Sequence, residues 1–239
     1  MQYNLLICSD THETVPTAHP QSPDPDPICW LHAGDFYLNK DIASTDDDAD
    51  AQYADTIGAL EGGEAYQWFK GNKLPIYAVR GNHDGHDAWG FFHSVHDITG
   101  KVMHLQRKLL LAGLGWHGRN YNDLPNDAAF AGISAAISRA VYKERQPGDM
   151  LILLSHYPAF ATPAADNADD SFESLRTLAR TIQPDVIIQG HIHQWFSSQY
   201  EVDLPKATRG AAEHALVINP GSGGGLLSID TSKGSVKYT

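Results

Sequence analysis

Short apolar runs that end in Gly, Pro, Asn or Asp recur along this chain of 239 residues and constrain its fold more than any other feature. Runs of this length, bounded by turn-forming residues, are typical of buried strands. We therefore predict strands at residues 3–8, 28–33, 76–79, 109–114, 151–154, 186–189, 216–219 and 226–229.

Helical periodicity lies between several of these runs. One i, i+3, i+4 stripe comprises Ile133, Ala136, Ile137, Ala140 and Val141, and another comprises Phe172, Leu175, Leu178, Ala179 and Ile182. Strands that alternate with helices predict an α/β fold with parallel pairing. No repeat or linker divides the chain, so we expect a single domain over residues 1–239.

Composition limits the class of partner. The chain is 42% hydrophobic, enough to bury a full core, and its 17 Lys and Arg against 29 Asp and Glu give a net charge of −12. This acidity argues against a nucleic-acid partner, because such binding depends on cations that neutralise phosphates. It does not argue against a small anionic substrate, since bound metal ions reverse the local field.

Cysteine usage and the apolar runs bear on location. Cys8 and Cys29 both lie within apolar runs, which favours buried free thiols in a reducing compartment over a disulfide. No apolar run approaches the roughly 20 residues of a membrane helix, and residues 1–8 lack the basic stretch of a signal peptide. We therefore expect a cytoplasmic protein without a membrane segment. The proline-rich segment 16–27 and the acidic segment 39–55 are predicted loops whose role stays open.

Polar side chains follow five of the predicted strands directly. They are Asp10 and His12, then Asp35, then Asn82, His83 and Asp84, then His156, and finally His191 and His193. Singly, such residues also occur as turns or helix caps. Together they are expected to meet, because the carboxyl ends of parallel strands share one edge of a sheet. Carboxylates and imidazoles buried there need a counter-charge, and nitrogen and oxygen ligands without thiolates suit Mn²⁺, Fe²⁺, Zn²⁺ or Ni²⁺.

The order Asp-x-His, Gly-Asp, Gly-Asn-His-Asp, His, Gly-His-x-His resembles the calcineurin-like metallophosphoesterases over residues 10–193. The turn Asn219-Pro220-Gly221-Ser222 is a further similar feature. The resemblance implies a four-layer α/β/β/α sandwich of two mixed sheets. It also implies a dinuclear metal-dependent phosphoester hydrolase, with Mn²⁺ preferred and Fe, Zn or Ni as alternatives.

The resemblance also assigns roles by position. It implies that one ion is held by Asp10, His12, Asp35 and His193, and the other by Asp35, Asn82, His156 and His191, so that Asp35 bridges them. It places His83 beside the leaving oxygen, as a general acid or as a group that stabilises the transition state. We expect Asp84 to orient His83, with a turn or cap role as the alternative.

One departure from the protein phosphatases of this superfamily narrows the substrate. Their bridging aspartate is followed by a segment that ends Asp-Arg-Gly and grips phosphate, whereas no arginine follows in Gly34-Asp35-Phe36-Tyr37-Leu38-Asn39. The candidate substrate contacts are Arg80, Trp116, His117 and Arg119. The alternative role of Arg80 is a salt bridge. The alternative for Trp116 is a half-buried position in a surface loop.

We therefore prefer a phosphodiesterase that acts on a nucleotide or another small phosphodiester. A phosphomonoesterase acting on small molecules or proteins is the nearest alternative, followed by a non-catalytic scaffold and a DNA nuclease. The sequence leaves the native metal, the substrate and the oligomeric state open.

Overall fold

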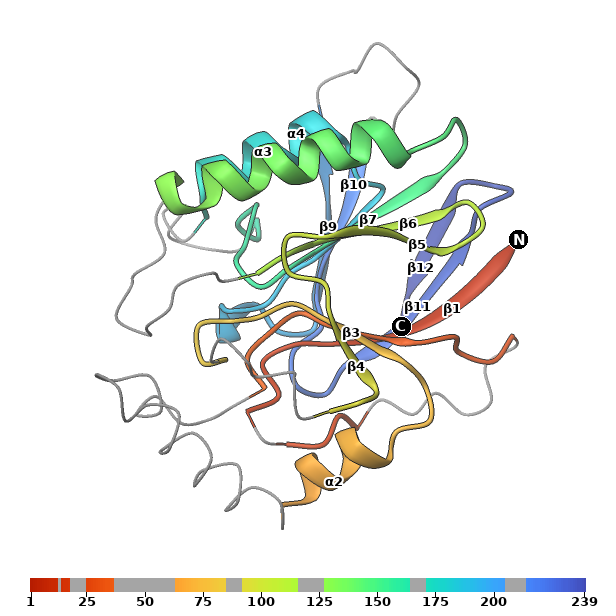
Figure 1. The fold of residues 1–239 in the computed structure, drawn as a ribbon, viewed down its shortest axis with the longest axis vertical. Helices are drawn as coiled ribbons and strands as arrows, with labels where there is room; N and C mark the ends of the chain where they lie inside the picture. The colour runs from red at the N-terminus through yellow and green to blue at the C-terminus, as the bar shows by residue number, and fades with distance from the viewer. Residues whose placement is uncertain are drawn as a thin grey trace.

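The computed structural model describes residues 1–12, 14–17, 25–36, 63–84, 92–115, 127–163, 171–204 and 214–239. Its helices and strands form four layers (Figure 1). Two sheets face each other in the middle. Helices α3 (Asp127–Glu144) and α4 (Glu173–Ile182) cover one outer face, and helix α2 (Glu64–Gly71) covers the other. The four-layer α/β/β/α sandwich is confirmed.

The first sheet has the order β12-β11-β1-β2-β3-β4. Its strands are β1 (Gln2–Cys8), β2 (Trp30–His32), β3 (Ile76–Ala78), β4 (Val95–Asp97), β11 (Gly225–Asp230) and β12 (Ser235–Tyr238). Strands β1 to β4 run parallel to one another, whereas β11 and β12 add antiparallel pairs.

The second sheet has the order β5-β6-β7-β8-β10-β9. Its strands are β5 (Val102–Gln106), β6 (Leu109–Leu114), β7 (Met150–Ser155), β8 (Val186–Ile188), β9 (Ser198–Asp203) and β10 (His214–Asn219). The inner strands β6, β7, β8 and β10 are parallel, and the edge strands β5 and β9 pair antiparallel. A short 3-10 helix, His193–Trp195, follows β8.

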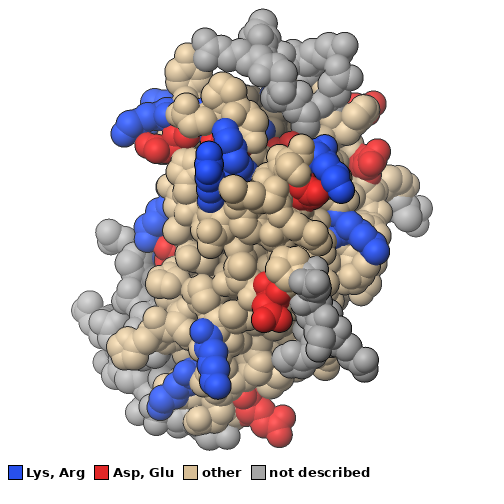
Figure 2. All heavy atoms as spheres, turned by 90° about the vertical axis from the view of Figure 1, so that its right-hand side faces the viewer, with Lys and Arg blue, Asp and Glu red and all other residues tan. Residues whose placement is uncertain are grey.

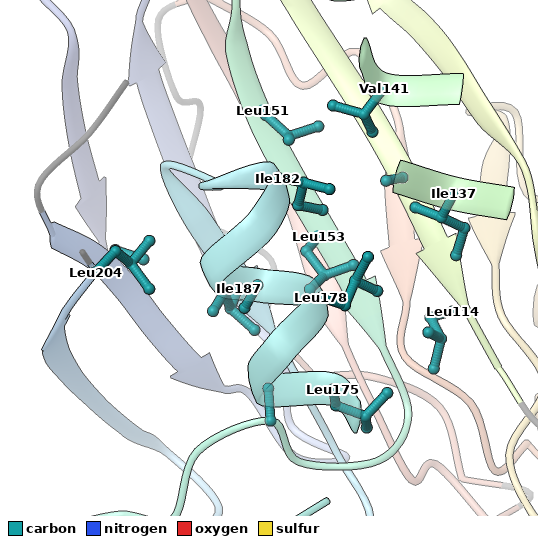
Figure 3. Close-up of a cluster of buried hydrophobic side chains, with 14 of the residues drawn as sticks. Leu114, Ile137, Val141, Leu151, Leu153, Leu175, Leu178, Ile182, Ile187 and Leu204 are labelled. Carbon is teal, nitrogen blue, oxygen red and sulfur yellow. The ribbon is translucent and has the colours of Figure 1, made fainter. Parts of the chain in front are cut away.

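Apolar side chains on alternating strand positions fill the spaces between the layers. Leu151 and Leu153 of β7 point outward and meet Leu175, Leu178 and Ile182 of α4, as Figure 3 shows. The spacing of these α4 residues places them on one helix face. This cluster fixes the helical layer on the second sheet.

The remaining two clusters lie on either face of the first sheet. Leu5 and Ile7 of β1 point into the layer between the sheets, whereas Leu6 and Cys8 point to the layer beneath α2. Cys29 lies in the layer between the sheets, so the two cysteines occupy opposite faces of one sheet. Both are buried free thiols, as expected.

The sequence predictions can be compared with these elements. Every predicted strand corresponds to a strand of the structure, and the two helical stripes lie on α3 and α4. The strands β4, β5, β9 and β12 and the helix α2 were not predicted. Residues 18–24 of the proline-rich segment and all of segment 39–55 lie outside the described residues. Within the described residues, no helix combines the length and apolar character needed to cross a membrane.

Candidate metal centre

The predicted ligands converge where strands of both sheets end. Two groups of side chains each have ligand atoms within 4.8 Å of one another: Asp10, His12 and His193, and Asp35, His156 and His191. Asp10 and Asp35 follow strands of the first sheet, and the histidines at 156, 191 and 193 follow strands of the second. Each group therefore draws on both sheets.

The first group is organised around the buried carboxylate of Asp10. Its two oxygens accept the backbone N–H of His191 at 2.9 and 3.2 Å, which ties the first sheet to the second. Nε2 of His193 lies 3.7 Å from Asp10 Oδ1 and 3.1 Å from Nε2 of His12. His193 is 57% exposed, so this group opens to solvent on one side.

The second group contains three electron-rich atoms that face one another. Nδ1 of His156 lies 2.9 Å from the carbonyl oxygen of Ala33, to which it donates its hydrogen. Nε2 of the neutral ring then carries a lone pair, 2.9 Å from Asn82 Oδ1 and 3.4 Å from Asp35 Oδ2. Burial, with the neighbouring His191, moves the pKa of His156 well below its ordinary value and keeps the ring neutral. A lone pair facing two oxygens is unfavourable unless a proton or a metal cation lies between them.

The carboxyl groups of the site are held in an environment that opposes their charge. Burial raises the pKa of Asp10 to about 7, and the charge of Asp84 adds to the rise. Burial also raises the pKa of Asp35 well above its ordinary value, with Asp84 and Asp10 as further causes. Burial lowers the pKa of His193, and the neighbouring His12 lowers it further. These carboxylates lack a positive counter-charge, and the imidazoles beside them are neutral. This combination suits the binding of divalent cations.

The backbone of the site adopts conformations that side chains usually avoid. Asp10, His12, Asp35 and His191 have φ angles of 50°, 44°, 57° and 70°. A positive φ is uncommon for residues other than glycine and costs on the order of 1–3 kcal/mol when it is strained. Four of the predicted ligands therefore depend on surrounding contacts to hold their backbone.

Two glycines of the sequence motifs allow the carboxylates to approach the backbone. A Cβ at Gly81 would lie 2.1 Å from Asp35 Oδ1, and a Cβ at Gly190 would lie 2.5 Å from Asp10 Oδ2. Any other residue would push the carboxylate away. The glycines of Gly-Asn-His-Asp and Gly-His-x-His are therefore required by packing against the site.

Asp84 bonds to the backbone of two loops. Its Oδ2 accepts the N–H groups of Asp35 and Gly81, both at 2.8 Å, and its Oδ1 accepts the N–H of Phe36 at 2.9 Å. In return, Asp35 Oδ1 accepts the backbone N–H of His83 at 2.8 Å. Asp84 thus joins the loop after β2 to the loop after β3. Its expected effect on the His83 ring stays a prediction.

The candidate substrate contacts are only partly described. Nε of Arg80 lies 3.4 Å from Asp97 Oδ2, and the backbone N–H of Arg80 bonds to Thr99 Oγ1 at 3.0 Å. This ion pair is the alternative role considered for Arg80. Trp116, His117 and Arg119 lie outside the described residues.

Two residues beside the ligands were not singled out from the sequence. The ring of Tyr157 packs against His156 and His191, with centroids 4.9 and 4.8 Å apart. His32 is fully buried at the end of β2, and burial lowers its pKa to about 3, with His12 as a further cause. A histidine inside an apolar run was the available signal, because a buried imidazole must find hydrogen-bond partners.

Comparisons with known proteins agree with this geometry. The family model for the calcineurin-like phosphoesterases matches residues 3–195. No curated protein matches the sequence at a significant level. One solved structure superposes with a TM-score of 0.65 at 13% identity, covering 100% of this chain and 99% of its own.

Two further solved structures are similar to the chain. The protein TT1561 of Thermus thermophilus has a TM-score of 0.54 at 14% identity, with 100% of this chain and 99% of that chain covered. GAP50, the anchor in the inner membrane complex of Plasmodium, has a TM-score of 0.50 at 9% identity, with 99% and 88% covered. At these identities the structures show the fold alone. Because the family match spans every residue of both ligand groups, the chain belongs to the calcineurin-like phosphoesterase family and is a phosphoester hydrolase.

Proposed function

We propose that the chain hydrolyses a phosphodiester of a nucleotide or another small molecule, using two divalent metal ions held where the strands of both sheets end. The observation that carries the proposal is the meeting of His156 Nε2, Asn82 Oδ1 and Asp35 Oδ2. These atoms are all electron donors, and they lie close together in a buried setting. A cation supplies the attraction that such an arrangement lacks.

Both groups have a composition suited to first-row divalent ions. The first ion would be held by Asp10, His12 and His193, and the second by Asn82, His156 and His191. Asp35 would be shared between the two ions, because only a carboxylate has two anionic oxygens to offer. Oxygen and imidazole ligands without thiolates support Mn²⁺, with Fe, Zn or Ni as alternatives. Bound ions of this kind polarise the phosphoryl group and lower the pKa of a coordinated water.

His83 is proposed to deliver the proton to the leaving oxygen. Its Nε2 lies 3.9 Å from Asp35 Oδ2, and its ring packs edge-on against His12 with centroids 5.1 Å apart. The bond from its backbone N–H to Asp35 fixes the start of the side chain. The ring therefore lies beside both ligand groups, as a proton donor to bound substrate requires.

The diester preference rests on the groups around the site. A phosphomonoester is dianionic and is commonly bound through a bidentate arginine. Within the described residues, Arg80 pairs with Asp97. Phe36, which follows Asp35, is buried among aromatic rings that include Phe69 and Phe92, so this position offers the substrate no cation. Both features support a substrate with less terminal charge.

Charge and cysteine chemistry support the expected setting. The net charge is −12, and basic and acidic side chains are interspersed on the face in Figure 2. This pattern favours a small substrate over a DNA nuclease role. The two buried free thiols support a reducing, cytoplasmic environment.

The test compares two substrates on one protein. The Mn²⁺-loaded chain should hydrolyse bis-(4-nitrophenyl) phosphate with a higher kcat/KM than 4-nitrophenyl phosphate. A preference for the monoester would replace the diesterase proposal with the phosphomonoesterase alternative. Binding of two ions without turnover of either ester or of single-stranded and double-stranded DNA would favour a non-catalytic role.

A further inference from the structure

His32 contacts two of the three loops that carry predicted ligands of the first sheet. Its Nδ1 accepts the backbone N–H of Gly34 at 3.2 Å, and its Nε2 lies 3.0 Å from Thr11 Oγ1. Because Nδ1 of this ring is an acceptor, Nε2 carries the hydrogen and donates it to Thr11. One buried ring therefore uses both nitrogens, on two different segments.

The bonded residues are direct neighbours of three predicted ligands. Thr11 lies between Asp10 and His12, and Gly34 precedes Asp35. All three ligands have positive φ, and so does Gly34 at 86°. Such backbones persist only where contacts from elsewhere hold them. His32 supplies contacts of this kind to both loops.

We propose that His32 is a positioning residue that sets the separation between the loop of Asp10 and His12 and the loop of Asp35. His32 acts on the backbone of the ligand residues. Its replacement should therefore change metal affinity before it changes any other property of the protein. The inference rests on the metal site of the proposed function. It does not depend on which phosphoester is the substrate.

A plain packing role is the competing explanation. The His32 ring packs against Phe69 with centroids 5.6 Å apart, so it also fills space in the cluster beneath α2. If His32 only fills space, its replacement should lower stability and leave metal affinity unchanged. The two explanations therefore differ in the metal-binding readout.

Two variants remove the bond between His32 and Thr11, one from each side, and leave the bond from Gly34 in place. His32→Asn keeps an acceptor near the position of Nδ1 and removes the donor that reaches Thr11. Thr11→Val removes the hydroxyl from the other side with almost no change in shape, and it serves if the histidine variant fails to fold. Tyr66→Leu is the matched control, because Tyr66 is buried in the same cluster on α2.

The experiment titrates Mn²⁺ into the metal-free proteins by calorimetry and records the electron paramagnetic resonance spectrum of the coupled ion pair. Groups that orient ligands typically contribute about 10–100-fold to metal affinity. We expect His32→Asn and Thr11→Val to weaken Mn²⁺ binding by roughly tenfold or more and to alter the coupled-pair spectrum. Tyr66→Leu should lower the melting temperature and keep the wild-type affinity and spectrum.

Wild-type Mn²⁺ affinity and spectrum in both His32→Asn and Thr11→Val would overturn the inference. An equal loss of Mn²⁺ affinity in Tyr66→Leu would overturn it too. These outcomes are separate from the fate of the proposed function. A wild-type chain that binds two ions but hydrolyses no phosphoester refutes the function and leaves the role of His32 to the titration. A wild-type chain that binds no Mn²⁺ overturns both.

Discussion

Replacing Asp84 with asparagine tests whether this carboxylate holds the backbone of the site. Three N–H groups bond to it at 2.8 to 2.9 Å, from Asp35, Gly81 and Phe36. If the asparagine oxygen takes the place of Oδ2, two bonds survive and its NH₂ group faces the N–H of Phe36. A hydrogen bond to a charged acceptor contributes about 1.5–3 kcal/mol, so the free energy of unfolding should fall by at least that amount.

The same substitution also has a stabilising effect, which opposes the loss of the hydrogen bond. The charge of Asp84 raises the pKa of both Asp10 and Asp35, so its removal also relieves repulsion. At a pH near 6 that relief is small, because Asp10, with a pKa of about 7, is mostly protonated in the metal-free protein. The lost bond should therefore dominate under this condition.

The assay is thermal unfolding of the metal-free protein near pH 6, followed by turnover of the Mn²⁺-loaded protein. For a chain of this size, each kcal/mol shifts the melting temperature by about 2–4 °C, so we expect a fall of roughly 3–12 °C. Asp149→Asn is a matched control, because Asp149 is a buried carboxylate that accepts the N–H of Gln146 at the amino end of β7. It should lower the melting temperature and keep wild-type Mn²⁺ affinity.

A different result would refute the reasoning. If Asp84→Asn unfolds at the wild-type temperature while turnover collapses, Asp84 acts on His83, as the sequence suggested, and its bonds to the backbone contribute little.

Three further predictions concern the ions and the proton donor. Asp35→Asn should abolish turnover and weaken Mn²⁺ binding at both positions by calorimetry; one ion bound at full strength would contradict a shared carboxylate. His83→Ala should bind Mn²⁺ as the wild type does and turn over roughly 10²–10⁴-fold more slowly, whereas metal loss would make it a ligand. Finally, the gain in melting temperature from Mn²⁺ over EDTA should grow from about pH 5 to about pH 7.5. The folded metal-free protein keeps the Asp10 proton up to a pKa of about 7, against 3.8 for an ordinary aspartate, so the stability from this proton is lost as pH rises across that window. At the upper end of this window the ionised Asp10 carboxylate binds metal. A gain in melting temperature from Mn²⁺ that shrinks as pH rises would contradict this linkage.

The strands that the sequence predicted and those it did not differ in their position within the sheets. The predicted strands all have neighbours on both sides, and their residues form apolar runs such as Leu109–Leu114. The missed strands β4, β5, β9 and β12 are the edges of the two sheets. In β9, Tyr200 and Val202 alternate with exposed Gln199 and Glu201, so no continuous apolar run marks it. Helix α2 is short, with few buried residues to form a stripe.

The sequence predicted which residues of the candidate site come together, but not the bonds that hold their backbone. Asp10, Asp35 and His156 follow strongly apolar strands, so their meeting at one edge could be inferred from strand order. The roles of Asp84 and His32 could not be inferred in the same way. Except for the bond from His32 to the Thr11 hydroxyl, their bonds go to backbone N–H groups in loops that contain residues with positive φ, and these conformations depend on the folded environment.

Each ligand group takes side chains from both sheets, and this has a consequence for how the enzyme tolerates change. The apolar layer that includes Leu5, Ile7, Ile152 and Leu154 acts as a spacer whose thickness sets the distance between the two halves of each candidate ligand group. A larger or smaller side chain there would stretch or compress these groups from a distance, without touching a ligand. In this molecule, core side chains that touch none of the predicted ligands therefore still affect the geometry of the candidate metal centre.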